Sequence, residues 1–61
     1  MKPLTPNQRA AKALTAMRDA RGAGATDAAI IAAGELAAGG DDAAKITDAI
    51  WRNKFLIMGA N

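Results

Sequence analysis

The fold of this chain depends most on its C-terminal stretch, which reads ITDAIWRNKFLIM from residue 46 to residue 58. This stretch contains seven of the fourteen Ile, Leu, Met, Phe and Trp residues of the chain, including both aromatic ones. Most of the remaining apolar residues are alanines, of which there are seventeen. An alanine side chain buries little apolar area, so the rest of the chain contributes little hydrophobic free energy. We therefore expect the C-terminal stretch to hold the fold together, to bind another molecule, or both.

Residues 42–58 are predicted to form a helix with two apolar stripes instead of one. At 100° per residue, the second stripe lies about 120° to 160° from the first. The first stripe consists of Ala43, Ile46, Ile50 and Ile57, and the second consists of Ala44, Trp51, Phe55 and Met58. One interpretation is that both stripes pack against neighbouring helices of the same chain. The other is that the second stripe, here called the aromatic stripe, binds another molecule.

The spacing of Trp51, Phe55 and Met58 favours binding. Residues at i, i+4 and i+7 form the face with which a helix lies in an apolar groove, and these residue types are enriched at the centres of interfaces. The other two helices contain few large apolar side chains that could cover both stripes. We therefore predict that the aromatic stripe anchors a partner, and that Arg52 and Lys54 at its border orient that partner. A homodimer that pairs the aromatic stripe with itself would also cover it.

The first helix is predicted over residues 6–21. Thr5 and Gln8 have the spacing of a capping box, in which each residue bonds the backbone of the other, and Pro6 suits the first helical position. Gly22 then ends the helix, because glycine is common at C-terminal caps. The apolar stripe of this helix consists of Ala10, Ala13, Leu14, Met17 and Ala20.

The second helix is predicted over residues 27–38, with Thr26 as its N-cap. It carries one charge beyond its first turn, Glu35, and a helix that is apolar nearly all round is normally buried on several sides. Its small-residue face consists of Ile30, Ala33, Gly34 and Ala37. A glycine within a helix costs about 1 kcal/mol relative to alanine. A close contact with a neighbouring helix at Gly34 would explain that residue.

The third helix is predicted over residues 42–58, after the break GGDD at residues 39–42, with Asp41 or Asp42 as its cap. Residues 55–58 could instead add a short strand to the edge of a partner's sheet. Together the patterns predict an all-α fold, a compact three-helix domain that spans residues 1–61 as one domain. Because a core of this size barely outweighs the entropy of the chain, we expect the domain to self-associate.

Several classes of function are excluded by composition. The chain has no cysteine and no histidine, so it lacks the usual ligands of a zinc site. The absence of tyrosine as well removes the commonest general bases and nucleophiles, so we expect no enzymatic activity, no cofactor, no metal and no small-molecule substrate. No apolar run approaches the ~20 residues that span a bilayer. We expect a complete cytoplasmic product without membrane contact.

Nucleic-acid binding is the main alternative function. The net charge is +2 and the isoelectric point is about 9.5. Three short helices also fit a helix-turn-helix, but the start of the third helix, which would read the bases, is net acidic. Phosphates would repel that surface. If the chain binds DNA, we expect the contacts to come from the basic residues of the first helix, which are Arg9, Lys12, Arg18 and Arg21.

The sequence thus predicts a small protein-binding or regulatory module, such as an adaptor, an inhibitor or an accessory subunit. Bacteria, phages and mobile elements encode many proteins of this size and form. The expected partner is another protein, a second copy of the chain, or both. A DNA-binding regulator is the second hypothesis.

Overall fold

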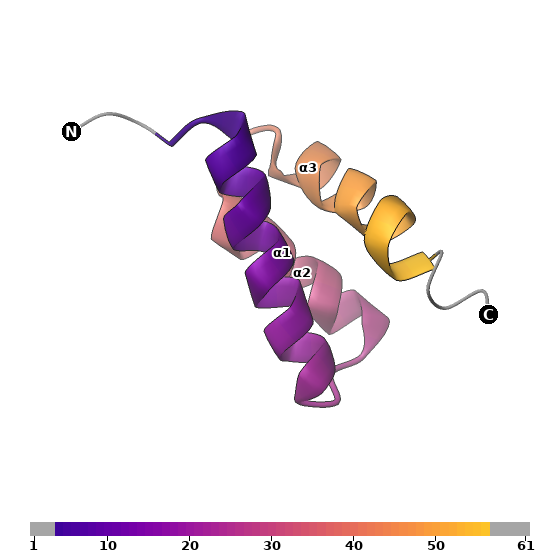
Figure 1. Cartoon of the computed structure of the whole chain (residues 1–61). Coiled ribbons are helices and arrows are strands. Elements are labelled where there is room, and N and C mark those ends of the chain that lie inside the picture. Colours follow the sequence, from indigo (N-terminus) through magenta and orange to yellow (C-terminus); the bar gives the residue numbers. More distant parts are fainter. Residues whose placement is uncertain (1–3, 57–61) are drawn as a thin grey trace.

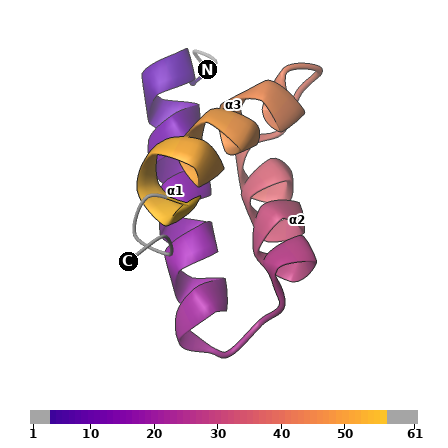
Figure 2. The same ribbon diagram turned by 90° about the vertical axis from the view of Figure 1, so that its right-hand side faces the viewer.

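The computed structural model describes residues 4–56, and within them the chain forms three α-helices and one π-helical turn. The helices are α1 (Pro6–Gly22), α2 (Asp27–Ala38) and α3 (Ala43–Ile50), and the π turn η1 (Trp51–Leu56) continues α3 without a break. Helices α1 and α2 form an antiparallel hairpin (Figure 1). Figure 2 shows α3 and η1 crossing this hairpin, from the end of α2 to the middle of α1. The predicted all-α, three-helix fold is confirmed.

The starts of α1 and α2 follow the predicted capping signals. The Thr5 hydroxyl accepts a hydrogen bond from the Gln8 amide at 3.1 Å, and the Gln8 side chain accepts one from the Thr5 amide at 2.8 Å, which completes the capping box. The Thr26 hydroxyl accepts from the Ala29 amide at 3.2 Å. Helix α1 ends at Gly22, one residue later than predicted, and α2 has the predicted bounds.

The third helix differs from its prediction at both ends. It begins at Ala43, and neither predicted aspartate caps it through a side-chain hydrogen bond, because Asp42 pairs with Arg9 instead. Its α-helical part ends at Ile50, where the hydrogen bonding changes to the i→i+5 pattern of a π-helix. Residues 57–61, which include Ile57 and Met58, lie outside the described residues.

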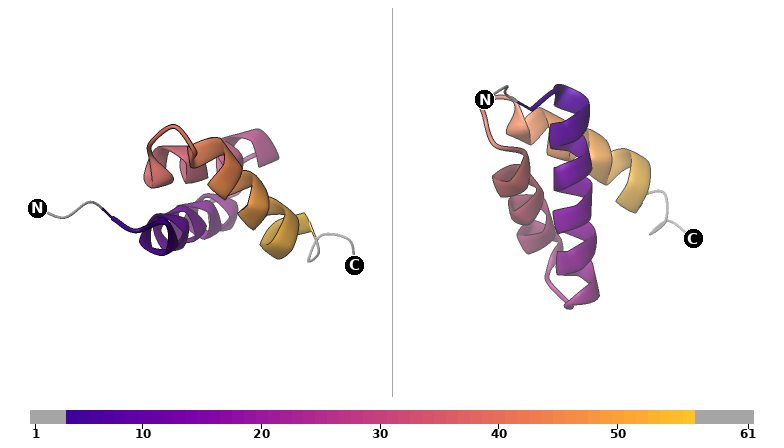
Figure 3. Two further views of the ribbon diagram at one scale, coloured as in Figure 1. Left: turned by 90° about the horizontal axis from the view of Figure 1, so that it is seen from above. Right: turned by 60° about the vertical axis from the view of Figure 1, so that its left-hand side comes forward.

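The core consists of two small clusters that share one residue of α3. The first contains Ala13, Ala38 and Ala43, and the second contains Met17, Ile30 and Phe55. Ile50 packs against both clusters, so the end of α3 connects the alanine-rich contact to the larger side chains of the second cluster. The two views of Figure 3 show α3 packed on one side of the α1–α2 hairpin.

The three helices lie close together at Gly34. A Cβ atom on this residue would lie 2.7 Å from the Cγ and Sδ atoms of Met17 and 2.9 Å from Cγ2 of Thr47. Both of these side chains are fully buried. The contact predicted for Gly34 is therefore confirmed, and it involves both neighbouring helices.

Among residues 4–56, the structure contains no helix whose length and hydropathy would let it cross a membrane.

Candidate functional site

The aromatic stripe is divided between the core and the surface. Phe55 is 6% exposed and packs against Met17 and Ile30. The guanidinium of Arg21 lies 5.4 Å from the centre of the Phe55 ring. The expectation that this ring is available to a partner is therefore wrong, because the ring is part of the core of the single chain.

The π turn explains this difference. At 100° per residue, Phe55 would lie about 140° from Ile50 on an α-helix and would face away from the core. In a π turn, residues five apart are hydrogen-bonding neighbours and lie on nearly the same side. The turn at residues 51–56 therefore rotates Phe55 onto the face of Ile50, and the two predicted stripes merge at this end of the helix.

The other predicted interface residues differ in their exposure and in their contacts. Trp51 is half-buried and stacks on Phe55. Arg52 is exposed and forms an i,i+4 ion pair with Asp48, with Nε 3.2 Å from Oδ2. Lys54 is exposed. Met58 lies outside the described residues.

An open groove of about 500 Å³ runs between α1 and α3. The walls are mostly apolar, and none of the lining residues is acidic. The lining residues are Asn7, Ala10, Ala11 and Leu14 from α1, Ile46, Ala49 and Ile50 from α3, and Asn53 and Lys54 from η1. Ile46 and Ile50 each pack partly on the core and partly line this groove, so the first stripe also reaches the surface.

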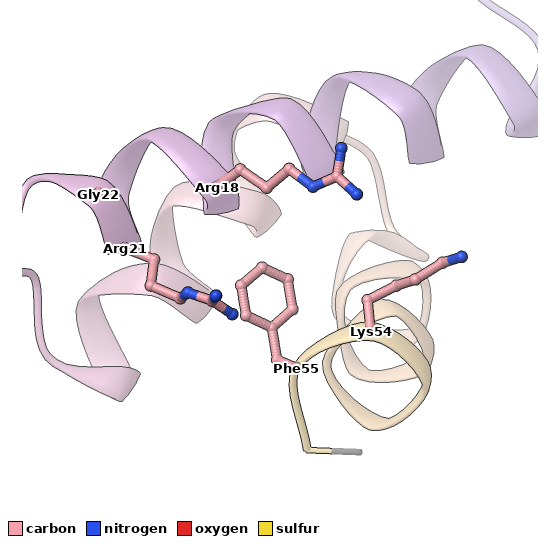
Figure 4. A pocket seen from close by; sticks show the side chains of 5 residues that line it. All are labelled: Arg18, Arg21, Gly22, Lys54 and Phe55. Atoms are coloured by element: carbon pink, nitrogen blue, oxygen red, sulfur yellow. The ribbon is translucent and has the colours of Figure 1, made fainter. Parts of the chain in front are cut away.

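A second, smaller pocket of about 310 Å³ lies next to this groove, towards the C-terminal end of α1. It is lined by Arg18, Arg21, Gly22, Lys54 and Phe55, as Figure 4 shows. Lys54 lines both the groove and this basic pocket. The two cavities are therefore parts of one surface that follows α1 on the side of α3.

Among residues 4–56, the large apolar side chains exposed elsewhere do not form a comparable surface. Leu36 on α2 is 87% exposed, Leu56 on η1 is 52% exposed, and Leu4 before α1 is 44% exposed. They come from different elements, and single exposed leucines are normal on protein surfaces.

The four basic residues predicted as nucleic-acid contacts do not form one surface. Arg9 is used inside the fold: its Nε donates to the Ala38 carbonyl at 3.1 Å, and its guanidinium also bonds the Gly39 carbonyl and the Asp42 carboxylate. This hydrogen bond from Arg9 lowers the pKa of Asp42 below its ordinary value of 3.8. The expectation that Arg9 contacts phosphates is therefore corrected: it joins the start of α1 to the α2–α3 turn.

The remaining three basic residues of α1 lie on two faces. Lys12 lines a shallow pocket towards α2, together with Thr15, Ala16 and Asp19, so an acidic residue shares its surface. Arg18 and Arg21 lie in the basic pocket, where the structure adds Lys54 from η1. Helix α1 therefore presents two of its four basic residues, Arg18 and Arg21, in the same pocket.

Comparison of the chain with protein-family models, with curated proteins and with solved structures gave no match. The sequence interpretation missed the groove residues Ala10, Leu14 and Ala49 as candidate site residues. Their signal was present in the excess of apolar surface on residues 42–58, but it was assigned to the aromatic stripe alone, of which Phe55 is buried.

Proposed function

We propose that the chain is a small, non-enzymatic protein-binding module that acts in the cytoplasm as an adaptor, an inhibitor or an accessory subunit. The observation that supports this proposal is the apolar groove between α1 and α3. The groove is formed by residues of α1, α3 and η1, and its Ile46 and Ile50 also pack against the core. It therefore takes the place of the aromatic stripe as the proposed binding surface.

The shape and composition of the groove suit an amphipathic helix of the partner. Ala10, Ala11 and Ala49 are small enough to let a helix approach closely, and Leu14, Ile46 and Ile50 add larger apolar side chains to the same lining. Binding of this kind uses apolar anchors at i, i+3, i+4 and i+7 of the incoming helix. Asn7 and Asn53, which also line the groove, offer hydrogen bonds that can set its register.

The buried part of the aromatic stripe supports this surface from beneath. Phe55 packs in the same cluster as Met17, and Ile50 lies between this cluster and the groove. A change at Phe55 would therefore affect binding through the stability of the domain. Lys54 keeps its proposed role as a charge at the border of the binding surface.

The proposal can be tested with a display library of helical peptides about 16 residues long. Peptides are selected on the immobilised protein, and binding of the enriched peptides is competed with soluble wild type and with two variants. Ala49→Gln places a polar amide in the groove, and Ala44→Gln is the matched control on another exposed face of α3. Both residues are exposed, so both variants should fold.

We expect the wild type and Ala44→Gln to compete equally, and Ala49→Gln to compete about tenfold less well, because its amide loses hydrogen bonds to water in an apolar interface. The proposal is wrong if no peptide is enriched. If the two variants compete equally, the groove is not the binding site.

A second copy of the chain belongs to the proposed partners, because the small core favours association. Light scattering on a size-exclusion column measures this directly. A concentration-dependent dimer that Ala49→Gln weakens and Ala44→Gln does not would identify a second copy as an occupant of the groove. If the chain is a monomer at every concentration, the proposed occupant of the groove is a different protein.

A further inference from the structure

We infer that the basic pocket of Arg18, Arg21 and Lys54 binds acidic side chains of the partner, so that the partner segment combines apolar anchors with an acidic end. This inference rests on the proposed function of the groove. It specifies the chemistry of the partner.

The charges of the pocket lack partners within the part of the chain that the structure describes. The two ion pairs among residues 4–56 join Arg9 to Asp42 and Arg52 to Asp48. None of the residues that line the groove or the pocket is acidic. The surface therefore concentrates positive charge at one end and complements negative charge on a bound segment.

The pocket is also partly pre-arranged. The guanidinium of Arg21 lies over the Phe55 ring at 5.4 Å, a distance at which the ring attracts the cation. Figure 4 shows the ends of Arg18 and Lys54 extending past the same side of this ring. Arg18, Arg21 and Lys54 are all exposed, so an incoming carboxylate can reach each of the three cations.

The pocket continues the groove along α1. Arg18 follows Leu14 by four residues and Arg21 follows it by seven, so the three side chains lie on one face of the helix, one turn apart. A helix that places its apolar side chains against Leu14 would reach the pocket one turn further on, after about 5.4 Å. Its acidic residues should therefore lie within about one or two turns of its apolar anchors.

The same surface is poorly suited to duplex DNA. Binding to a duplex depends on many phosphate contacts, whereas Arg9 is bonded within the fold and Lys12 lies beside Asp19 on another face. A duplex also offers nothing to fill an apolar groove. An acidic peptide uses both parts of the surface.

The test repeats the peptide selection on charge-reversed proteins. The double variant Arg18→Glu/Lys54→Glu reverses the pocket, and Lys12→Glu/Lys45→Glu is the matched control, with the same change in net charge at exposed lysines outside it. Circular dichroism confirms that each protein is folded. Fluorescence anisotropy then measures the affinity of peptides enriched on the wild type.

We expect Asp and Glu to be enriched within two turns of the apolar positions on the wild type and on the control variant, and Lys and Arg to replace them on the pocket variant. Wild-type peptides should bind the pocket variant at least about tenfold more weakly and the control variant within about twofold of wild type.

Two outcomes would overturn the inference. In the first outcome, the enriched peptides fail to bind Ala49→Gln but show no preference for acidic residues. The groove would then remain the proposed binding site, and the partner would not be acidic. A fluorescent duplex of about 20 base pairs that binds the wild type, is displaced by the peptides and is lost in the pocket variant would assign the pocket to phosphates. Failure to enrich any peptide would overturn the proposed function and, with it, this inference.

Discussion

The ring of Phe55 stacks on the indole of Trp51, with the ring centres 5.3 Å apart and the planes at 10° to each other. The pair closes the core cluster of Met17 and Ile30 on the side of η1, and Arg21 covers it from α1. The two aromatic residues of the chain therefore hold α3 against the hairpin.

Removal of the Phe55 ring should destabilise the domain severely. Phe55→Ala deletes a ring that is 6% exposed, and such changes typically cost about 3–5 kcal/mol, which is close to the whole stability expected for a domain of this size. We expect that this variant no longer unfolds in a cooperative transition when urea is added, as measured by circular dichroism. Leu56→Ala, next to it and 52% exposed, should change the free energy of unfolding by no more than about 0.5 kcal/mol. Equal stability of the two variants would show that Phe55 is outside the core.

Gly34→Ala should be destabilising although alanine is the better helix former. The added methyl group would lie 2.7 Å from Met17 and 2.9 Å from Thr47, and both of these side chains are fully buried. Overpacking of this kind costs about 1–3 kcal/mol, and the gain in helix propensity offsets about 1 kcal/mol of it. The control is Gly22→Ala, where no atom lies within 4 Å of the new methyl. The close approach of the helices is refuted if Gly34→Ala unfolds at a higher urea concentration than wild type.

Thr47→Val should stabilise the domain by about 1 kcal/mol. The Thr47 side chain is fully buried, and its hydroxyl has no hydrogen-bond partner among the residues described. Valine keeps the shape and removes the desolvated hydroxyl. Thr47→Ser is the opposite control, because it keeps the hydroxyl and leaves a cavity of one methyl group, at a cost of about 1 kcal/mol. Thermal unfolding followed by circular dichroism ranks the three proteins. A valine variant less stable than wild type would mean that the hydroxyl is bonded in solution.

The Arg9–Asp42 pair should make stability depend on acidity. The pKa of Asp42 is below 3.8 in the folded chain, so the folded state favours the charged carboxylate. Its contribution is present above pH 3.8 and is lost as the pH falls through the lowered pKa. Below about pH 4, the free energy of unfolding measured with urea should therefore fall more for wild type than for Asp42→Asn. Asp41→Asn is the neighbouring control and should follow wild type. The same acid dependence in wild type and in Asp42→Asn would contradict the pairing.

The sequence predicts α1 and α2 well because their boundaries depend on local signals. Thr5, Gln8 and Thr26 bond backbone groups within three residues of themselves, and such bonds can be inferred from spacing alone. The small residue at Gly34 also indicates a close contact, although the sequence does not identify Met17 and Thr47 as its neighbours.

The π turn and the role of Arg9 depend on distant parts of the chain. The change to i→i+5 bonding accompanies the packing of Phe55 against Met17, which lies on another helix. Arg9 bonds carbonyl groups that are 29 and 30 residues away in the sequence. A helical wheel with a fixed step of 100° cannot anticipate a local change of period, so it identified the apolar excess of residues 42–58 but placed the buried ring of Phe55 on the exposed side.

The most direct test of the groove is nuclear magnetic resonance of the labelled protein bound to an enriched peptide. We predict intermolecular nuclear Overhauser effects from the peptide to the methyl groups of Ala10, Leu14, Ile46 and Ala49. Effects to Leu36 and Ala44, on other exposed faces, without effects to those four residues would contradict the account.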